Sequence, residues 1–454
     1  MSAVATLVPE TTATGPRLTW LRERGMGASI LVAILSSAFG VVLVEATGYI
    51  GVMLQSDPYI GDSGMLAAVV SILTVLLVGV ALYVAAIVTA NTFSTIIAGR
   101  TRRIALVRLI GASARSQRVE VARQGLIVGI IGAAGGIVVG LLITVTGVLI
   151  AERILGPVES FTLLQPSILL PAAGVALTTW IAAWVGSRRV LTVTPLQALA
   201  GSVERSQDEV SSRPARHVGA LLLVIIGIGL LVFGVFIGLV SPLGVIVSFF
   251  GGLLSFTGIS LAAVRVMPPL LRLVGRAFGR SATARMAAEN ALRYPERSSR
   301  MAIGVVMGVT LVTMFAVALE SVKVLLTKAA GGELDSQFSI IMDSFAAVMM
   351  VLVGVSAVIA AVGLVNLLTI GVVQRKRELG LLRAIGLSNR QVRGMIMLEA
   401  LHITVTATVT GLVLGVLYGW IAAQSLLGAV HMPPNFNQTA GLIAPAVPWV
   451  PVVV

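Results

Sequence analysis

Long uncharged apolar runs alternate with short charged segments along the whole chain. Each run approaches or exceeds the roughly 20 residues that a helix needs to cross a bilayer. The runs are 25–44, 63–99, 124–151, 160–187, 218–264, 301–319, 344–374 and 400–454. Two of them are too long for one crossing. The run 218–264 is divided by Ser241-Pro242-Leu243-Gly244, and the run 400–454 is divided by Pro433-Pro434-Asn435. The pattern predicts an all-α polytopic membrane protein with about ten transmembrane helices, the last of them short.

Composition and charge agree with this class and add an orientation. Of the 454 residues, 57% are hydrophobic and 11% are charged, whereas a soluble domain keeps roughly a quarter of its residues charged. With the N-terminus in the cytoplasm, 29 of the 32 basic residues fall on cytoplasmic segments, as the positive-inside rule requires. The net charge of +13 therefore reflects membrane topology, and nucleic-acid binding is not expected.

A segment in the second half of the chain repeats one in the first half. Aligning Gly111 with Gly386, 275 residues apart, brings further identical residues together. These pairs are Arg102 with Arg377, Arg108 with Arg383, Ser113 with Ser388, Arg115 with Arg390, Arg118 with Arg393 and, upstream, Asn91 with Asn366. The offset spans an even number of predicted helices, so the two copies share one orientation. This is a parallel repeat, related by an axis along the membrane normal.

The repeat predicts two parallel four-helix units joined by a two-helix hairpin. The predicted divisions are a cytoplasmic N-terminal segment 1–25, a first unit 26–200, a linker 201–217, the hairpin 218–268, a second linker 269–300 and a second unit 301–454. Pro295 is expected to end a surface helix before the chain turns into the membrane. The last span, at about 441–454, looks cut short, so we expect the natural chain to continue beyond Val454.

The stretch Arg377-Glu378-Leu379-Gly380-Leu381-Leu382-Arg383-Ala384-Ile385-Gly386 resembles the FtsX/MacB-like permease family of ABC transporters. The family's pre-helix segment is similar to Asn290-Ala291-Leu292-Arg293-Tyr294-Pro295-Glu296-Arg297. The stretch around Pro195 is similar to the usual end of a unit in this family. The resemblance covers essentially the whole chain in two copies. It implies a membrane subunit driven by a separate cytoplasmic ABC ATPase, which is a dimer. The ATPase would dock on a coupling helix that follows the second span of each unit.

The resemblance implies that the ATPase-coupling residues are Arg377, Glu378, Leu379, Gly380, Leu382, Arg383, Ile385 and Gly386, with Arg102, Arg103, Arg108 and Gly111 in the first copy. The chemistry of the segment agrees, because Leu379, Leu382 and Ile385 form an apolar stripe at helical spacing. The glycines permit close approach and a turn. The alternative is that the basic residues only fix topology and the leucines only pack.

The first copy departs from the family pattern. Arg103 stands where the second copy has Glu378, and Ala105 stands where it has Gly380. The first coupling segment is therefore degenerate, and we expect its contact with the ATPase to be weaker or different.

Polar residues inside the spans are few. Four of them lie close to the two coupling segments and are candidates for hydrogen bonds between helices, with simple helix capping as the alternative: Asn91, Asn366, Gln124 and Glu399. Glu45 is expected at a helix end, in the membrane interface.

The sequence contains no Gly-x-x-x-x-Gly-Lys-[Ser/Thr] motif, so ATP and Mg²⁺ are expected to bind the partner and not this chain. The three histidines have no metal-ligand spacing, and no catalytic set is visible, so the chain is not expected to be an enzyme or to hold a cofactor.

The function expected is that of a multi-pass permease subunit in the cytoplasmic membrane that exports or extracts an amphipathic or lipid-like substrate. Spans without charges at mid-membrane offer a polar solute no solvated path. The main alternative is an FtsX-like signalling protein that transmits force without transport, although the outer connections 47–65 and 323–343 are too short for a domain. A secondary transporter should carry ionisable residues at mid-membrane, and an intramembrane enzyme has the least support. Whether one chain or two serve an ATPase dimer stays open.

Overall fold

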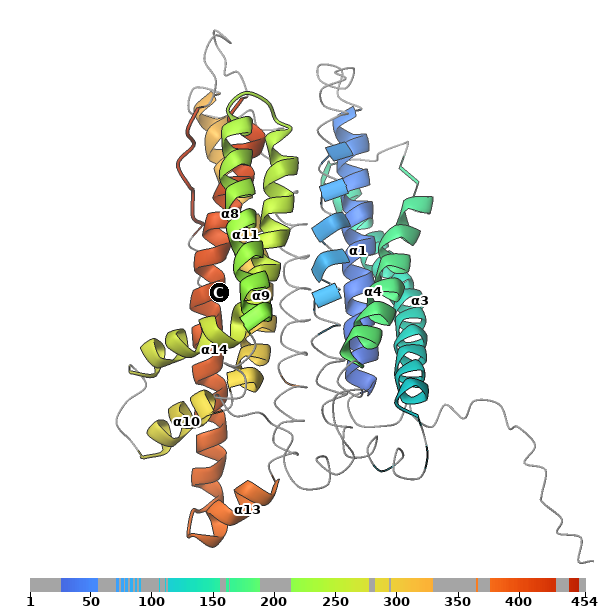
Figure 1. The fold of residues 1–454 in the computed structure, drawn as a ribbon. Helices are drawn as coiled ribbons and strands as arrows, with labels where there is room; N and C mark the ends of the chain where they lie inside the picture. The colour runs from blue at the N-terminus through green and yellow to red at the C-terminus, as the bar shows by residue number, and fades with distance from the viewer. Residues whose placement is uncertain are drawn as a thin grey trace, which may run out of the picture.

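All regular structure in the described part of the chain is helical (Figure 1). The computed structural model describes residues 26–55, 71–72, 75–76, 78–80, 82–84, 86–87, 90, 106, 111, 113–155, 161–162, 164–187, 214–276, 282–293, 295–329, 365, 376–429 and 441–448. Apart from Val365, the apolar run 344–374 lies outside these ranges, and so does more than half of the run 63–99. Residues Asn91, Asn366, Arg102, Arg103 and Arg108 also lie outside them.

The helices are α1 (Met26–Gln55), α3 (Ala114–Leu155), a 3₁₀ turn η2 (Pro166–Ile168), α4 (Leu169–Gly186), α8 (Pro214–Gly238), α9 (Gly244–Gly275), α10 (Ala282–Arg293), α11 (Pro295–Ala329), α13 (Lys376–Ala384) and α14 (Asn389–Leu427). Within the described residues, seven helical segments are long and apolar enough to cross a membrane. The predicted all-α polytopic fold is confirmed. The predicted unit boundaries stay predictions.

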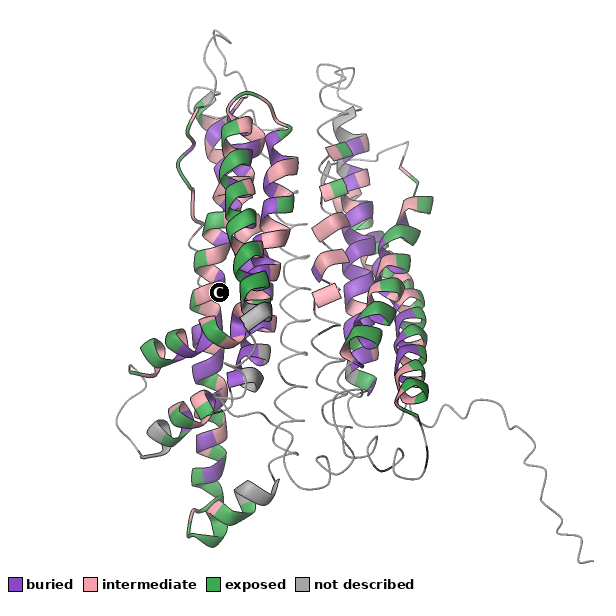
Figure 2. Ribbon diagram, in the orientation of Figure 1, coloured by how far each residue is buried: buried purple, intermediate pink, exposed green. Residues whose placement is uncertain are grey.

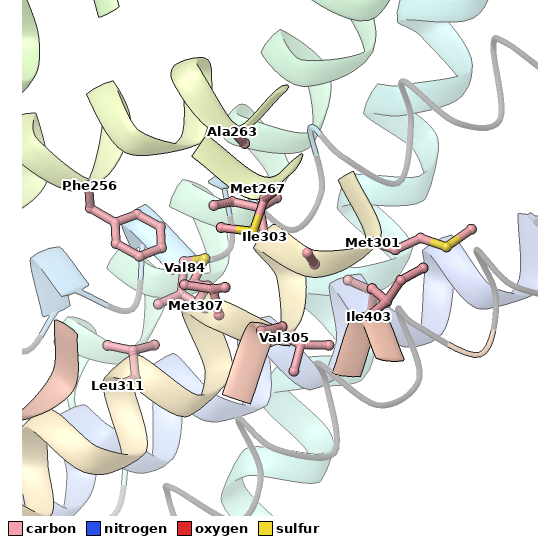
Figure 3. Packing of buried hydrophobic residues seen from close by; sticks show 14 of the residues in the cluster. Val84, Phe256, Ala263, Met267, Met301, Ile303, Val305, Met307, Leu311 and Ile403 are labelled. Atoms are coloured by element: carbon pink, nitrogen blue, oxygen red, sulfur yellow. The ribbon is translucent and has the colours of Figure 1, made fainter. Parts of the chain in front are cut away.

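The described helices gather into two bundles. One contains α1, α3 and α4, and the other contains α8, α9, α10, α11 and α14 (Figure 1). The central hairpin of α8 and α9 therefore packs with the second unit, mainly against α14 and α11. The largest core cluster includes residues from α1, α9, α10, α11 and α14, with Met267, Ile303 and Ile403 almost completely buried (Figure 3).

The outer faces of the bundles are apolar. Along α8, side chains more than half exposed include Leu221, Ile225 and Phe233, and exposed positions alternate with buried ones along each helix (Figure 2). In a soluble protein such a surface would be a liability. On a transmembrane helix it is the face that contacts lipid, since lipid tails are as apolar as leucine.

Glycines bring α1 close to α3 in the first bundle and α11 close to α14 in the second. The pairs in the first bundle are Gly132 with Ala33, Gly136 with Ser37 and Gly140 with Val41, and in the second Gly411 with Val309, Gly415 with Thr313 and Gly419 with Val317. A Cβ atom added at Gly136 would lie 2.2 Å from the Cβ of Ser37, so only glycine fits there. Small residues of this kind let transmembrane helices approach closely.

The two seams are copies of one another. Gly136 and Gly411 are related by the 275-residue offset of the sequence repeat, and so are Gly140 and Gly415. Their partners on α1 and α11 are related by an offset of 272 residues in both cases. The pair α1–α3 and the pair α11–α14 therefore pack in the same register, which is the structural form of the repeat.

Prolines mark two helix boundaries as expected. The chain reverses at Ser241–Gly244 between α8 and α9, and α10 ends at Arg293 just before α11 begins at Pro295. Pro295 has no N–H to donate to the carbonyl of Ala291 one turn earlier. The hydroxyl of Ser298 donates to that carbonyl instead, at 2.7 Å, so the carbonyl of Ala291 has a donor despite the break.

The predicted tenth helix is wrong over residues 441–448, which are not helical. Pro445 and Pro448 lie in this stretch and Pro451 follows, and a proline at every third position removes the N–H groups that a helix needs. The segment instead lies along α14. Gln424 donates to the carbonyl of Gly441 and accepts from the N–H of Ile443, both at 2.7 Å, and the indole of Trp420 donates to the carbonyl of Ile443, also at 2.7 Å.

Candidate functional site

The segment with the family motif folds as a short helix, a tight turn and the start of a long helix. α13 ends in a turn in which the N–H of Leu387 donates to the carbonyl of Leu382 at 3.1 Å, and the N–H of Gly386 donates to that of Arg383 at 3.0 Å. This is the Schellman arrangement, which needs a positive φ at its glycine. Gly386 has a φ of +111°. The predicted turn thus lies at the expected glycine.

A capping box starts the next helix two residues later. The hydroxyl of Ser388 accepts from the N–H of Gln391 at 3.2 Å, and the side chain of Gln391 accepts from the N–H of Ser388 at 2.9 Å. Each of the two groups satisfies a backbone donor that a helix start leaves unpaired. The turn and the cap together fix the angle between α13 and α14, so the two helices form one joint. We call α13, its turn and the first turns of α14 the elbow.

The elbow presents an apolar pair within a basic surround. α13 lies at one end of the molecule with α14 as its packing partner among the described helices (Figure 1). Leu381 is 58% exposed and Ile385 is 79% exposed, one helical turn apart. Arg383, Arg390 and Arg393 are exposed around them. The result is a small surface that combines apolar and positively charged groups.

The predicted apolar stripe is only partly as expected. Ile385 is exposed, but Leu382 is half buried, as is Leu387. A hydrophobic contact between these two positions commonly accompanies the Schellman turn. Leu381, which is not part of the predicted stripe, is exposed instead. The side chains of Arg377, Glu378 and Leu379 lie outside the described residues. Gly380 is exposed, and a Cβ atom there would meet no described atom within 4 Å.

The first copy of the elbow keeps the same backbone features. Gly111 has a φ of +107°, close to that of Gly386. The hydroxyl of Ser113 accepts from the N–H of Ser116 at 3.0 Å, which caps α3 as Ser388 caps α14. Leu106, the counterpart of Leu381, is 48% exposed.

The arginines after the two elbows differ in their surroundings. The guanidinium of Arg118 lies over the ring of Trp184 in α4, 4.1 Å from its centroid, which is a cation–π contact. Its counterpart Arg393 is exposed. The first elbow therefore uses this arginine within its own bundle, whereas the second leaves it on the surface.

One helical turn above the second elbow, α14 is bonded to its neighbours. The amide of Asn290 in α10 donates to the carboxylate of Glu399, which is 6% exposed. The Nε2 of His402 is 2.7 Å from the carbonyl oxygen of Leu271 in α9. These two contacts connect the start of α14 to α10 and α9. Gln124, the counterpart of Glu399, donates to Glu120 within α3, at 3.2 Å.

Two copies of one packed helix pair, each with a capped glycine turn just before its second helix, define a polytopic membrane protein built by internal duplication. Comparison with family models matches residues 75–195 and 350–454 to the FtsX-like permease C-terminal domain. The two matches begin 275 residues apart, the same offset that relates Gly111 to Gly386. The chain belongs to the FtsX-like permease family. Neither the curated proteins nor the solved structures gave a match to it.

Replacing Gly386 by alanine is expected to loosen the elbow. A residue with a Cβ is strained at a φ of +111°, by roughly 1–2 kcal/mol, so the Schellman turn should open more often. Hydrogen exchange of residues 380–392 in nanodiscs should become faster. Gly380→Ala is the matched control, because its Cβ would enter open space and alanine favours a helix by about 1 kcal/mol. Equal exchange in both variants would contradict the role of the turn.

Proposed function

We propose that this chain couples ATP hydrolysis by a cytoplasmic ABC ATPase to the export or extraction of an amphipathic or lipid-like substrate. Family membership makes it an ABC-type permease subunit. The observation that carries the coupling proposal is the elbow, because it places an apolar pair and Arg383 at the projecting end of the molecule, with Arg390 and Arg393 beside them at the start of α14. Such a surface suits a groove on a soluble partner with acidic residues at its rim.

The contacts above the elbow supply a route for force. A push on α13 acts on α14 through the Schellman turn and the capping box. From α14 it reaches α10 through Asn290 and Glu399, and α9 through His402 and Leu271. The hydroxyl of Ser299 in α11 donates to the carbonyl of Ala263 in α9 at 3.0 Å, so α11 would move with this group. The second bundle would then rock as a unit.

The proposed substrate class follows from the surface of the helices. Leucine, isoleucine and phenylalanine side chains cover the lipid-facing sides of α4 and α8. Access from the bilayer therefore suits these helices better than a solvated channel, and an amphipathic molecule could enter this way.

The proposed orientation, with the N-terminus and both elbows in the cytoplasm, gives a labelling prediction. The chain has no cysteine, so single cysteines can be introduced without removing any. Cysteines at Ser56, Ser160 and Ser336 should react with an impermeant maleimide in whole cells, and cysteines at Ser116 and Asn389 should react only after lysis. Labelling of the second group in intact cells would reverse the orientation.

The partnership itself is tested by enzymology. The purified chain should hydrolyse no ATP, and the ABC ATPase encoded with it should co-purify and hydrolyse ATP in the complex. Rapid hydrolysis by the isolated chain would overturn the proposal. An ATPase that binds the complex normally but moves no amphiphile across vesicles would favour the force-transmitting alternative without transport.

A further inference from the structure

The seam between α1 and α3 changes character toward its outer end. Ala33, Ser37 and Val41 meet Gly132, Gly136 and Gly140 in steps of four residues along both helices. By the same spacing of four residues, the next positions along the seam are Glu45 on α1 and Thr144 on α3. A carboxylic acid and a hydroxyl thus follow three turns of tight, mainly apolar contact.

Glu45 lies well inside the helix, so its expected place at a helix end was wrong. α1 continues to Gln55, ten residues further on, which is about 15 Å along the axis. Glu45 is 1% exposed, Thr144 is 6% exposed and Tyr49, one turn above Glu45, is 7% exposed. Both carboxylate oxygens and both hydroxyls lack a hydrogen-bond partner in the structure as described. Buried polar groups normally have partners, and ionisable ones within a membrane mark functional sites.

The second bundle shows that the fold does not need these groups. By the offsets that relate the two seams, Val317 corresponds to Glu45 and Gly419 corresponds to Thr144. A Cβ atom at Gly419 would lie 2.9 Å from the Cβ of Val317, so the two helices are tightly packed there without polar groups. The polar pair in the first bundle is therefore not a requirement of packing.

The surroundings of Glu45 are acidic and aromatic. Glu152, two turns beyond Thr144 on α3, is half buried and close enough to Tyr49 to act on it electrostatically. The rings of Tyr49 and Phe161 meet edge to face, with centroids 5.2 Å apart. Arg153, which follows Glu152 in the sequence, is exposed. Among the described residues, neither Glu45 nor Glu152 has an ion-pair partner.

We infer that Glu45, Thr144 and Tyr49 form a binding site for the primary ammonium group of an amphipathic substrate that enters from the outer part of the first bundle. An ammonium group has three N–H donors, and these three residues offer unpaired oxygen acceptors. Glu45 supplies the opposite charge, and the rings of Tyr49 and Phe161 are suited to contact a cation. The inference rests on the proposed transport function for the identity of its ligand, and it names the substrate class.

The test measures binding of radiolabelled dodecylamine to the full-length chain in nanodiscs at neutral pH, with empty nanodiscs subtracted. The unaltered chain should bind it saturably, and Glu45→Gln should weaken binding at least tenfold. Dodecyltrimethylammonium, which has the charge but no N–H donors, should compete at least tenfold less well. Glu289→Gln, at an exposed position on α10, is the matched control and should bind normally.

A second variant separates loss of the site from misfolding. Glu45→Val combined with Thr144→Gly copies the seam of the second bundle, so it should fold normally and lose saturable binding. Absence of saturable binding by the unaltered chain, or binding by Glu45→Gln equal to it, would overturn the inference. ATPase and nucleotide are absent from the assay. If the chain binds the amine normally but does not couple to an ATPase in the separate co-purification experiment, the proposed function is wrong and the site is not.

Competition also distinguishes two sources of the ammonium group. Displacement by lysophosphatidylethanolamine, but not by lysophosphatidylcholine, would assign it to a lipid headgroup. Intact dodecylamine binding without this displacement would assign it to an amine that is not part of a phospholipid.

Discussion

Charge reversal Glu378→Arg is expected to weaken the complex with the ATPase roughly ten- to hundredfold, whereas Arg103→Glu should change it far less. Disrupting a charged interaction at a docking surface costs about 1–3 kcal/mol. An exposed charge that only fixes topology is worth under about 1 kcal/mol. Glu378 belongs to α13, the elbow helix that projects from the second bundle, while Arg103 belongs to the copy that departs from the family pattern.

The measurement is co-purification of the ATPase with each variant, together with the ATPase rate in nanodiscs, at matched expression and membrane insertion. Glu378 is the third residue of α13, where a negative charge also favours the helix. Glu378→Gln removes the charge without adding a repulsive one and should give an intermediate loss. Near-normal behaviour of both charge reversals would mean that the basic segments are topology signals and that the coupling assignment is wrong.

Gly415→Ala is expected to separate α11 from α14 and to destabilise the second bundle by about 1–3 kcal/mol. The new Cβ atom would lie 2.4 Å from the Cβ of Thr313 and 2.9 Å from the carbonyl oxygen of Thr310. The second of these atoms belongs to the backbone, which cannot turn aside as a side chain can. The helices must therefore move apart, and this movement also weakens the apolar packing on either side of the seam.

Gly394→Ala provides the comparison on the same helix. A Cβ atom at Gly394 would meet no described atom within 4 Å, so the substitution should be neutral or stabilising by up to about 1 kcal/mol through helix propensity. Thermal unfolding in detergent, followed by circular dichroism or by fluorescence-detected size exclusion, should rank the two variants in this order. A Gly415→Ala variant as stable as the unaltered chain would show that the two helices are free to separate there.

The sequence predicts the features that local patterns determine. Apolar runs predict membrane spans, Pro295 predicts a helix break, and identical residues at one offset predict that Gly111 and Gly386 occupy equivalent places. Both glycines have the positive φ that a turn at this place requires. The hairpin of α8 and α9 was also predicted, since Pro242 interrupts a run that is too long for one helix.

Features that depend on residues distant in sequence were not predicted. An apolar stripe drawn on a helical wheel cannot tell that Leu382, whose carbonyl closes the Schellman turn, is half buried while Leu381 stays exposed. Hydropathy alone favoured a helix at 441–448, although the spacing of prolines in that stretch could have indicated an extended chain. The expected place of Glu45 at a helix end was wrong because α1 does not stop with the apolar run and continues for ten residues past Glu45.

The extended segment at 441–448 has a mechanical consequence for α14. Its hydrogen bonds to Trp420 and Gln424, and that of Ala446 to Ser321 in α11, hold α14 near its outer end. From Gln424 to Asn389, where α14 begins, the helix runs about 53 Å at 1.5 Å per residue, well beyond the roughly 30 Å thickness of the hydrocarbon core. A tilt of about 5° around the held end displaces the elbow by about 5 Å. In the proposed orientation, with the ATPase at the elbow, α14 would act as a lever held at its far end, so a large displacement of the elbow would become a small rotation with a larger force within the membrane.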